Sequence, residues 1–185
     1  MVFTSGIIDH ITRKLMLFTK KDGSLKKTEQ QTESLRIYRG NSFNIDQPKE
    51  WQDRTIHTLI GPIEDDIQHN ILITIDENVP FDSLLDYADW QITAMEESLK
   101  GCRLLKREEI LLNNGLPAYR AVFRWYPSDS LRVYQDHIFV LVDKTAYKLT
   151  TTFTKKTRKT LGPAVERILL SFQPEKASEK MKDGY

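Results

Sequence analysis

The sequence predicts a mixed α+β fold, in which a mainly antiparallel sheet carries one long helix between its strands and a second helix near the C-terminus. Three observations support this fold class. Apolar residues recur at helical spacing over residues 81–101, several extended segments separated by turn residues fill residues 103–154, and a second helical pattern covers residues 162–172. Strands with helices placed between and after them are typical of a sheet with helices packed on its faces.

The long helix has recognisable signals at both ends. Asp82 or Ser83 can cap its first turn, and Asp86 stands in the capping-box position relative to Ser83. Lys100 and Gly101 suit the last turn, because a cation favours the helix C-terminus and glycine tolerates positive φ. The spacing predicts one apolar stripe that packs on the sheet, formed by Leu84, Ala88, Ile92, Met95 and Leu99.

Four strand-sized segments precede this helix, and each is bounded by turn residues. They cover residues 35–38, 42–46, 53–60 and 69–75. We expect the third segment to end at Gly61 and Pro62. The fourth is dense in β-branched residues, which suits a central strand covered on both faces.

A meander of four strands follows the helix, over residues 103–112, 118–126, 131–142 and 147–154. The Asn113–Asn114–Gly115 turn gives the first pair the strongest hairpin signature in the chain. In the third strand, alternation places Gln135 and His137 on the same face as four apolar residues, which are Leu131, Val133, Phe139 and Leu141.

The chain is expected to form one domain with an extension at each end. Residues 1–36 combine a possible short amphipathic helix over 5–18 with a polar linker, the domain covers 37–173, and the charged tail 174–185 is expected to be disordered. A length of 185 residues is enough for one sizeable core.

Composition excludes several classes of partner and location. Because 27 basic residues face 26 acidic ones, no strong field would attract nucleic acid or an anionic membrane. The single cysteine, Cys102, excludes an internal disulfide and fits a reducing compartment. Charged residues interrupt the N-terminal apolar stretch before it could act as a secretion signal, and no run of about 18 apolar residues predicts a membrane span.

No motif of catalysis or metal binding stands out. The four histidines are scattered and lack partners at metal-ligand spacing, and the sequence contains no nucleophile elbow or phosphate-binding glycine loop. The adjacent carboxylates Asp65–Asp66 and Glu108–Glu109 do not suit acid–base chemistry, because neighbours in a strand point to opposite faces and a loop pair is normally solvated. We therefore expect no enzyme activity, no cofactor and no metal site.

Gln91 on the helix and Gln135 on a strand are unusual because each lies among apolar neighbours. Two interpretations remain open at this stage. Each amide can satisfy a backbone group at a bulge or helix end. Alternatively, the two amides can belong to an open apolar surface that binds an apolar partner with its own hydrogen-bonding groups.

The order of several segments resembles the DcrB-related family, and within it the Eag chaperones of bacterial type VI secretion. The similar segments include PFDSLLDYADWQ and YQDHIFVLVD, and together they cover residues 43–56, 70–74, 80–91, 104–108, 115–118 and 134–143. The match extends over about residues 37–173. The first 36 residues lie outside the family pattern.

The resemblance implies a PsbP-like α/β/α sandwich that forms a homodimer in the cytoplasm and has no enzymatic task. It implies a chaperone or adaptor that shields the hydrophobic N-terminal transmembrane segments of an effector before the effector is loaded on the secretion spike. The family pattern places the client helix in a concave groove, without membrane insertion by the chaperone. The expected client-binding residues are Gln91, Gln135, Leu72, Met95, Leu99, Leu131, Ile56, Ile92 and Val133. The alternative is a PsbP-like binding protein of the cell envelope with another partner.

Overall fold

The computed structural model of the chain describes residues 35–40 and 42–175. The chain divides into two compact units, Met1–Arg54 and Thr55–Tyr185. The helix expected over residues 5–18, the linker that follows it and most of the charged tail lie outside the described residues.

The described part of the first unit contains an antiparallel hairpin. Strand β1 (Leu35–Arg39) pairs with β2 (Asn44–Pro48), and Arg39 lies opposite Asn44. The Gly40 N–H donates to the Phe43 carbonyl at 2.9 Å and closes the connection. Strand β2 thus lies two residues later in the chain than the predicted segment 42–46.

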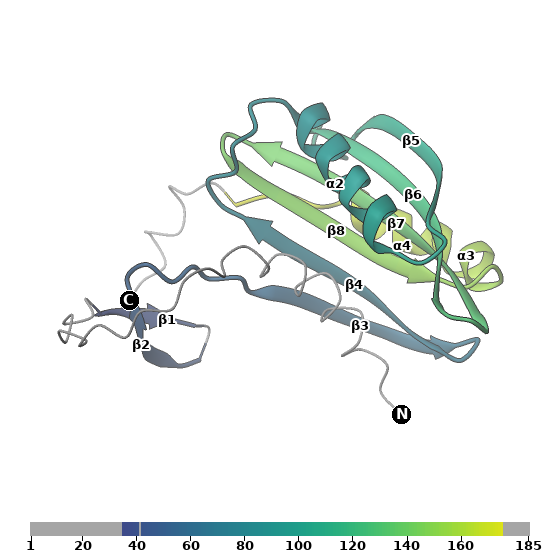
Figure 1. Cartoon of the computed structure of the whole chain (residues 1–185), viewed down its shortest axis with the longest axis horizontal. Helices are drawn as coiled ribbons and strands as arrows, with labels where there is room; N and C mark the ends of the chain where they lie inside the picture. The colour runs from purple at the N-terminus through teal and green to yellow at the C-terminus, as the bar shows by residue number, and fades with distance from the viewer. Residues whose placement is uncertain (1–34, 41, 176–185) are drawn as a thin grey trace, which may run out of the picture. The chain divides into compact units, whose positions relative to one another are not determined.

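The second unit is built on a six-stranded antiparallel sheet with the strand order β3-β4-β8-β7-β6-β5. Its strands are β3 (Ile56–Glu64), β4 (Ile67–Asp76), β5 (Arg103–Leu111), β6 (Pro117–Ser128), β7 (Leu131–Val142) and β8 (Thr145–Phe153). Helix α2 (Leu84–Ser98) lies on one face of the sheet, and α4 (Gly162–Leu170) lies on the other (Figure 1). The predicted α+β class with a mainly antiparallel sheet is therefore confirmed.

Helix α2 begins as its sequence predicts but ends earlier, because Leu99 is its C-cap and Lys100 and Gly101 lie beyond its last turn, which contains no basic residue. The Ser83 side chain accepts a hydrogen bond from the Asp86 N–H at 3.3 Å, which satisfies one of the free donors of the first turn. Gly101 has a φ of 60°, a conformation that glycine adopts without steric cost. Tyr87 and Gln91 are buried beside the predicted apolar stripe, so the face that packs on the sheet is wider than the stripe alone.

The first two strands of the sheet differ from the prediction. Strand β4 is second from the edge rather than central. Strand β3 continues beyond Gly61 and Pro62, because a register shift between Ile60 and Ile63 accommodates the proline, which edge strands tolerate. Asp65 and Asp66 then form the hairpin turn with φ values of 54° and 63°, as a two-residue type I′ turn requires.

A short helix that the sequence did not predict, α3 (Thr157–Thr160), precedes α4. Thr154 and Thr157 stabilise its start by a reciprocal exchange of hydrogen bonds. The Thr157 hydroxyl accepts from the Thr154 N–H at 2.9 Å, and the Thr154 hydroxyl accepts from the Thr157 N–H at 3.1 Å. Both threonines are buried, so this local motif fixes the chain between β8 and α4.

Apolar packing fills both sides of the sheet. On the α4 side, the buried cluster consists of Ile71, Leu112, Ala118, Ile138, Val140, Leu149 and Leu169. On the α2 side, the Tyr87 ring meets the Phe139 ring edge to face at 6.0 Å, and neither residue is exposed to solvent. The strand alternation expected for residues 131–142 thus places Phe139 under α2 and Ile138 under α4.

Candidate functional site

Helix α2 covers only part of its face of the sheet. It packs mainly on β6 and β7, and Figure 1 shows β3 and β4 extending beyond it. Residues paired across antiparallel strands share a face, so the register identifies the side chains beyond the helix. We call these residues the open strip: Ile56, Thr58, Ile60 and Ile63 on β3, with Asn70, Leu72 and Thr74 on β4.

Apolar side chains dominate the edge of the open strip. Ile60 is 75% exposed, Ile63 is 72% exposed and Ile56 is 38% exposed, whereas Leu72 is half-buried. Strand β3 is also an outer strand of the sheet, so one side of its backbone faces no strand of the second unit. Exposed apolar surface on an unpaired edge is unusual in a soluble protein and is typical of an interaction site.

A row of polar side chains on β8 lies between α2 and the open strip. Lys148, Thr150 and Thr152 alternate along this strand, and each forms a hydrogen bond with a residue of the α2 side, which is Gln91, His137 and Gln135, respectively. Lys148 Nζ donates to Gln91 Oε1 at 3.3 Å, and Gln135 Nε2 donates to the Thr152 hydroxyl at 3.1 Å. Both predicted glutamines therefore bond to β8, four residues apart on one face.

The amides of these glutamines are largely occupied by internal contacts. Gln91 is 8% exposed and also donates from Nε2 to the Tyr87 hydroxyl at 3.1 Å. Gln135 is 6% exposed. Gln91 is thus held in a fixed orientation at the border of the open strip, with its amide oxygen shared with Lys148.

His137 is a buried neutral imidazole beneath this border. Its Nδ1 lies 3.0 Å from the Thr150 hydroxyl, and its ring stacks on Phe139 with a centroid distance of 6.0 Å. Burial, followed by the charge of Lys148, lowers the pKa of His137 to about 3. The histidine is therefore uncharged at neutral pH and contributes polarity without charge.

The other predicted client-binding residues fall into two groups. Ile92, Met95, Leu99 and Val133 are buried. They pack in the interior of the domain and present little surface to a partner. Leu72 and Leu131 are half-buried and Ile56 is exposed, so these side chains offer apolar surface on the α2 side.

Sequence reasoning missed Lys148, Thr152, Ile60 and Ile63. The alternation in the segment YKLTTTF could have placed Lys148 and Thr152 on one face, opposite the apolar residues Tyr147, Leu149 and Phe153. Ile63 was missed for a different reason, because Gly61 and Pro62 predicted the end of the strand, whereas a bulge carries the strand past them. Ile60 lies inside the predicted strand, but only the fold shows that its face is left uncovered.

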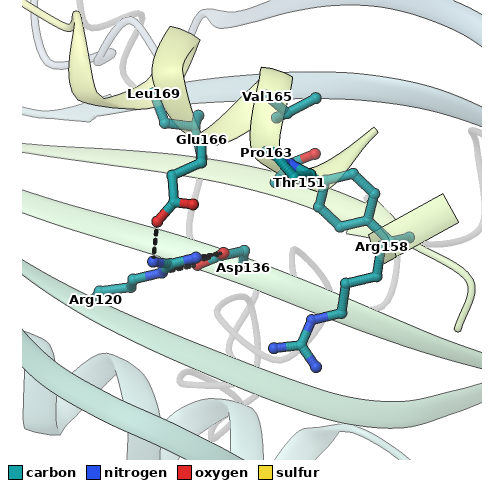
Figure 2. Close-up of a pocket in the computed structure, with 10 residues that line it drawn as sticks. Arg120, Asp136, Thr151, Arg158, Pro163, Val165, Glu166 and Leu169 are labelled. Carbon is teal, nitrogen blue, oxygen red and sulfur yellow. Dashed lines mark hydrogen bonds and ion pairs between the residues drawn. The ribbon is translucent and has the colours of Figure 1, made fainter. Parts of the chain in front are cut away.

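The opposite face of the sheet contains a cavity of about 180 Å³ between α4 and the sheet, shown in Figure 2. Arg120 Nε donates to Asp136 at 2.9 Å, and Arg120 also forms an ion pair with Glu166 of α4. Hydrogen bonds and ion pairs with these carboxylates raise the pKa of Arg120, against the opposing effect of burial. Because one guanidinium serves both acids, the cluster joins α4 to the sheet and leaves neither carboxylate available as a free base.

Other reactive groups in the described residues form no assembled centre. Burial, and then the nearby charge of Glu96, raises the pKa of the Cys102 thiol to about 11, so the thiol stays protonated at neutral pH. The described residues contain no group of three His, Cys, Asp or Glu side chains that could hold a metal ion. Within the same ranges, no helix has the length and apolar character needed to cross a bilayer.

This architecture defines an α+β domain with helices on both faces of one antiparallel sheet. The chain belongs to the DcrB family, whose sequence model matches residues 42–171. The resemblance to the DcrB-related family is thereby confirmed, whereas the closer resemblance to the Eag chaperones stays a prediction. No curated protein sequence matches the chain.

Several solved structures are similar to this one. A protein of unknown function from Pseudomonas aeruginosa has a TM-score of 0.63 and 21% identity, over 77% of this chain and 99% of that one. Cyanobacterial PsbP from Synechocystis sp. PCC 6803 has a TM-score of 0.49 and 14% identity, over 83% of this chain and 98% of that one. The Ran-binding protein Mog1p from Saccharomyces cerevisiae has a TM-score of 0.41 and 10% identity, over 71% and 84%. At 21% identity, the similarity to the Pseudomonas aeruginosa protein concerns the fold alone.

Proposed function

We propose that this protein is a non-catalytic chaperone or adaptor of the cytoplasm that shields hydrophobic segments of a type VI secretion effector before the effector is loaded on the spike. One observation carries the proposal. The open strip exposes the apolar side chains of Ile56, Ile60 and Ile63 on the face that α2 leaves uncovered. The resemblance of the chain to the Eag chaperones supplies the identity of the client.

The dimensions of the uncovered face suit a single helix. Strands β3 and β4 lie beyond α2, and β8 lies beside them at the border of the helix. At a spacing of about 4.8 Å they span about 10 Å, which is the diameter of one α-helix with its side chains. The nine residues of β3 extend about 30 Å, the length of a helix of about 20 residues.

The chemistry of this face also suits an apolar client. Burial of apolar surface contributes about 25 cal/mol per Å², so an unshielded membrane segment aggregates in water unless another apolar surface covers it. The isoleucines would provide that surface. The half-buried Lys148 and Thr152 would bind water at the border of this surface when no client is present.

The proposal includes a homodimer. The outer edge of β3 faces no strand within the second unit, and a second copy that pairs with this edge would protect it. Light scattering coupled to gel filtration should give twice the mass of the chain. A monomer at all concentrations would remove the dimer from the proposal and leave the client-binding surface to be tested separately.

Co-expression tests the proposed function. A reporter that carries a 20-residue Leu- and Ala-rich segment should be soluble with the wild-type protein and insoluble with the variant Ile60→Asp/Leu72→Asp. The matched control is Leu111→Asp, because Leu111 is 67% exposed but lies on β5, the opposite edge strand. Equal rescue by wild type and the double variant would exclude the open strip as the client site.

A second function deserves one experiment because the chain belongs to the DcrB family. In this alternative the protein binds another partner at the cell envelope. Fractionation of cells that express the full chain distinguishes the two locations. Recovery in the cytoplasm supports the chaperone, and recovery in an envelope fraction supports the alternative.

A further inference from the structure

Lys148 lies near the centre of the α2 side of the sheet, where the charge of Asp76 acts on it but no acidic side chain forms an ion pair with it among the described residues. Its side chain is partly buried, and its Nζ donates to Gln91 Oε1 at 3.3 Å. An ammonium group has three donors, so this contact leaves hydrogen-bonding capacity unused.

A second polar group with an unused bond lies directly opposite. Thr74 on β4 pairs in register with Lys148 on β8, so both side chains lie on the same face. The Thr74 hydroxyl oxygen is buried and has no hydrogen-bond partner among the described residues. Because buried hydroxyls are normally bonded, this position favours a water molecule or a polar group of a ligand.

We propose that Lys148 and Thr74 form a subsite for a carboxylate, and that the apolar segment bound by this protein carries one Asp or Glu side chain there. The inference rests on the proposed function and adds a chemical requirement to the client. Lys148 would neutralise the acid, and the Thr74 hydroxyl would donate a second hydrogen bond. The surrounding Ile56, Ile60 and Leu72 would contact the apolar side chains on either side of that acid.

Charge complementarity favours a carboxylate over a neutral acceptor. A backbone carbonyl or an amide could accept a hydrogen bond from Lys148, but neither would neutralise its charge in a partly buried position. Hydrogen bonds between two ionised groups are about twice as strong as neutral ones. An acidic residue is also costly inside a membrane segment, so a chaperone that pairs with it would recognise a feature that such segments rarely carry.

Binding of matched peptides to the full chain tests this subsite. The probes are two fluorescent 20-residue Leu- and Ala-rich peptides, acetylated and amidated, with either Glu or Gln at the centre. Fluorescence anisotropy should show that wild type binds the Glu peptide about tenfold more tightly than the Gln peptide. Lys148→Met should abolish this preference, and Thr74→Val should reduce it.

Lys106→Met is the control, because Lys106 is an exposed strand lysine on β5, away from the open strip. This variant should keep the full preference for Glu. A Gln peptide with a free C-terminal carboxylate is a third probe. If it binds as tightly as the Glu peptide, the acid comes from a chain end, and the side-chain requirement is wrong.

The outcomes separate this inference from the proposed function. If both amidated peptides bind wild type equally well, or if Lys148→Met keeps the preference, the carboxylate subsite is overturned while the apolar site stands. If neither peptide binds wild type, the proposed function itself fails. Thermal unfolding of Lys148→Met and Thr74→Val verifies that each variant is folded before binding is compared.

Discussion

Lys148 Nζ on β8 and Gln91 Oε1 on α2 lie 3.3 Å apart, although 57 residues separate them in the chain. This hydrogen bond joins the side of the helix to the strand at which the covered part of the sheet ends. Since Gln91 also donates to the Tyr87 hydroxyl, its amide is oriented before any partner binds. A client that bonds to Gln91 must therefore use the hydrogen-bonding capacity that the Gln91 amide has left, or displace Lys148 from its oxygen.

Arg120→Met should lower the free energy of unfolding by about 3 kcal/mol, because it leaves Asp136 largely buried without its cation. Urea unfolding monitored by circular dichroism measures this change. Lys100→Met is the control, because Lys100 and Asp129 form an exposed ion pair whose loss should cost about 0 to 1 kcal/mol. Equal losses in the two variants would contradict a structural role for the Arg120 cluster.

His137→Gln should weaken the dependence of stability on pH. In the folded protein, burial lowers the pKa of His137 to about 3, whereas the unfolded chain binds the proton near pH 6.5. Above about pH 6.5 His137 is neutral in both the folded and the unfolded state, so its burial adds no dependence on pH. Below about pH 6.5 the free energy of unfolding falls by up to about 1.4 kcal/mol for each pH unit. This loss of stability ends only near pH 3, the pKa of His137 in the folded protein.

Urea titrations at pH 7.5, 6 and 5 measure this slope for wild type and His137→Gln. The variant can be less stable at every pH, since it alters the contact with Thr150, but its slope should be smaller. His57→Gln is the control, because His57 lies on exposed β3. A variant slope equal to that of wild type would show that His137 is not the group responsible.

Local sequence signals predicted most elements of the fold. The Ser83 cap, the positive φ of Gly101 and the turn at Asn113–Gly115 depend only on neighbouring residues, so the sequence alone predicts them. The path of β3 could not be predicted in the same way. Whether Gly61 and Pro62 end a strand or form a bulge depends on the strand beside them, which only the fold supplies.

The candidate site was predictable only in part. Alternation placed Gln135 on the apolar side of its strand, and helical spacing placed Gln91 at the border of the helix stripe. Neither pattern shows that both amides bond to β8, because that contact depends on the order of strands in the sheet. Apolar spacing also cannot distinguish the interior of a domain from its surface, so Met95 and Val133 were expected at a partner surface, whereas they lie buried in the domain.

Ile60→Asp/Ile63→Asp should remove an exposed apolar surface with little effect on stability. Both side chains are more than 70% exposed, with values of 75% and 72%, so substitution at these sites should change the free energy of unfolding by about 0.5 kcal/mol or less for each. Fluorescence of a hydrophobic dye should fall relative to wild type. Unchanged dye fluorescence would mean that this part of the strip is not accessible in solution.

Lys148→Met should leave stability unchanged or raise it by about 1 kcal/mol at pH 7. Burial lowers the pKa of Lys148, partly opposed by Asp76, which means that its charge costs free energy on folding. Because the unfolded chain holds the proton more tightly, this cost is present at neutral pH and is relieved as pH rises toward the unfolded pKa. Methionine removes the charge and keeps the apolar stem, although Gln91 Oε1 then loses the hydrogen bond that Lys148 donates to it.

The contrast with Arg120→Met makes this result informative. Arg120 forms ion pairs with three acidic residues, Asp136, Glu166 and Glu108, so its removal leaves the buried Asp136 without a cation. By contrast, no described ion pair includes Lys148. Urea unfolding at pH 7 and pH 9.5 should show a gain for Lys148→Met over wild type that shrinks at the higher pH. A loss of about 3 kcal/mol at pH 7 would show that Lys148 supports the fold, and its charge would then need no partner from outside the chain.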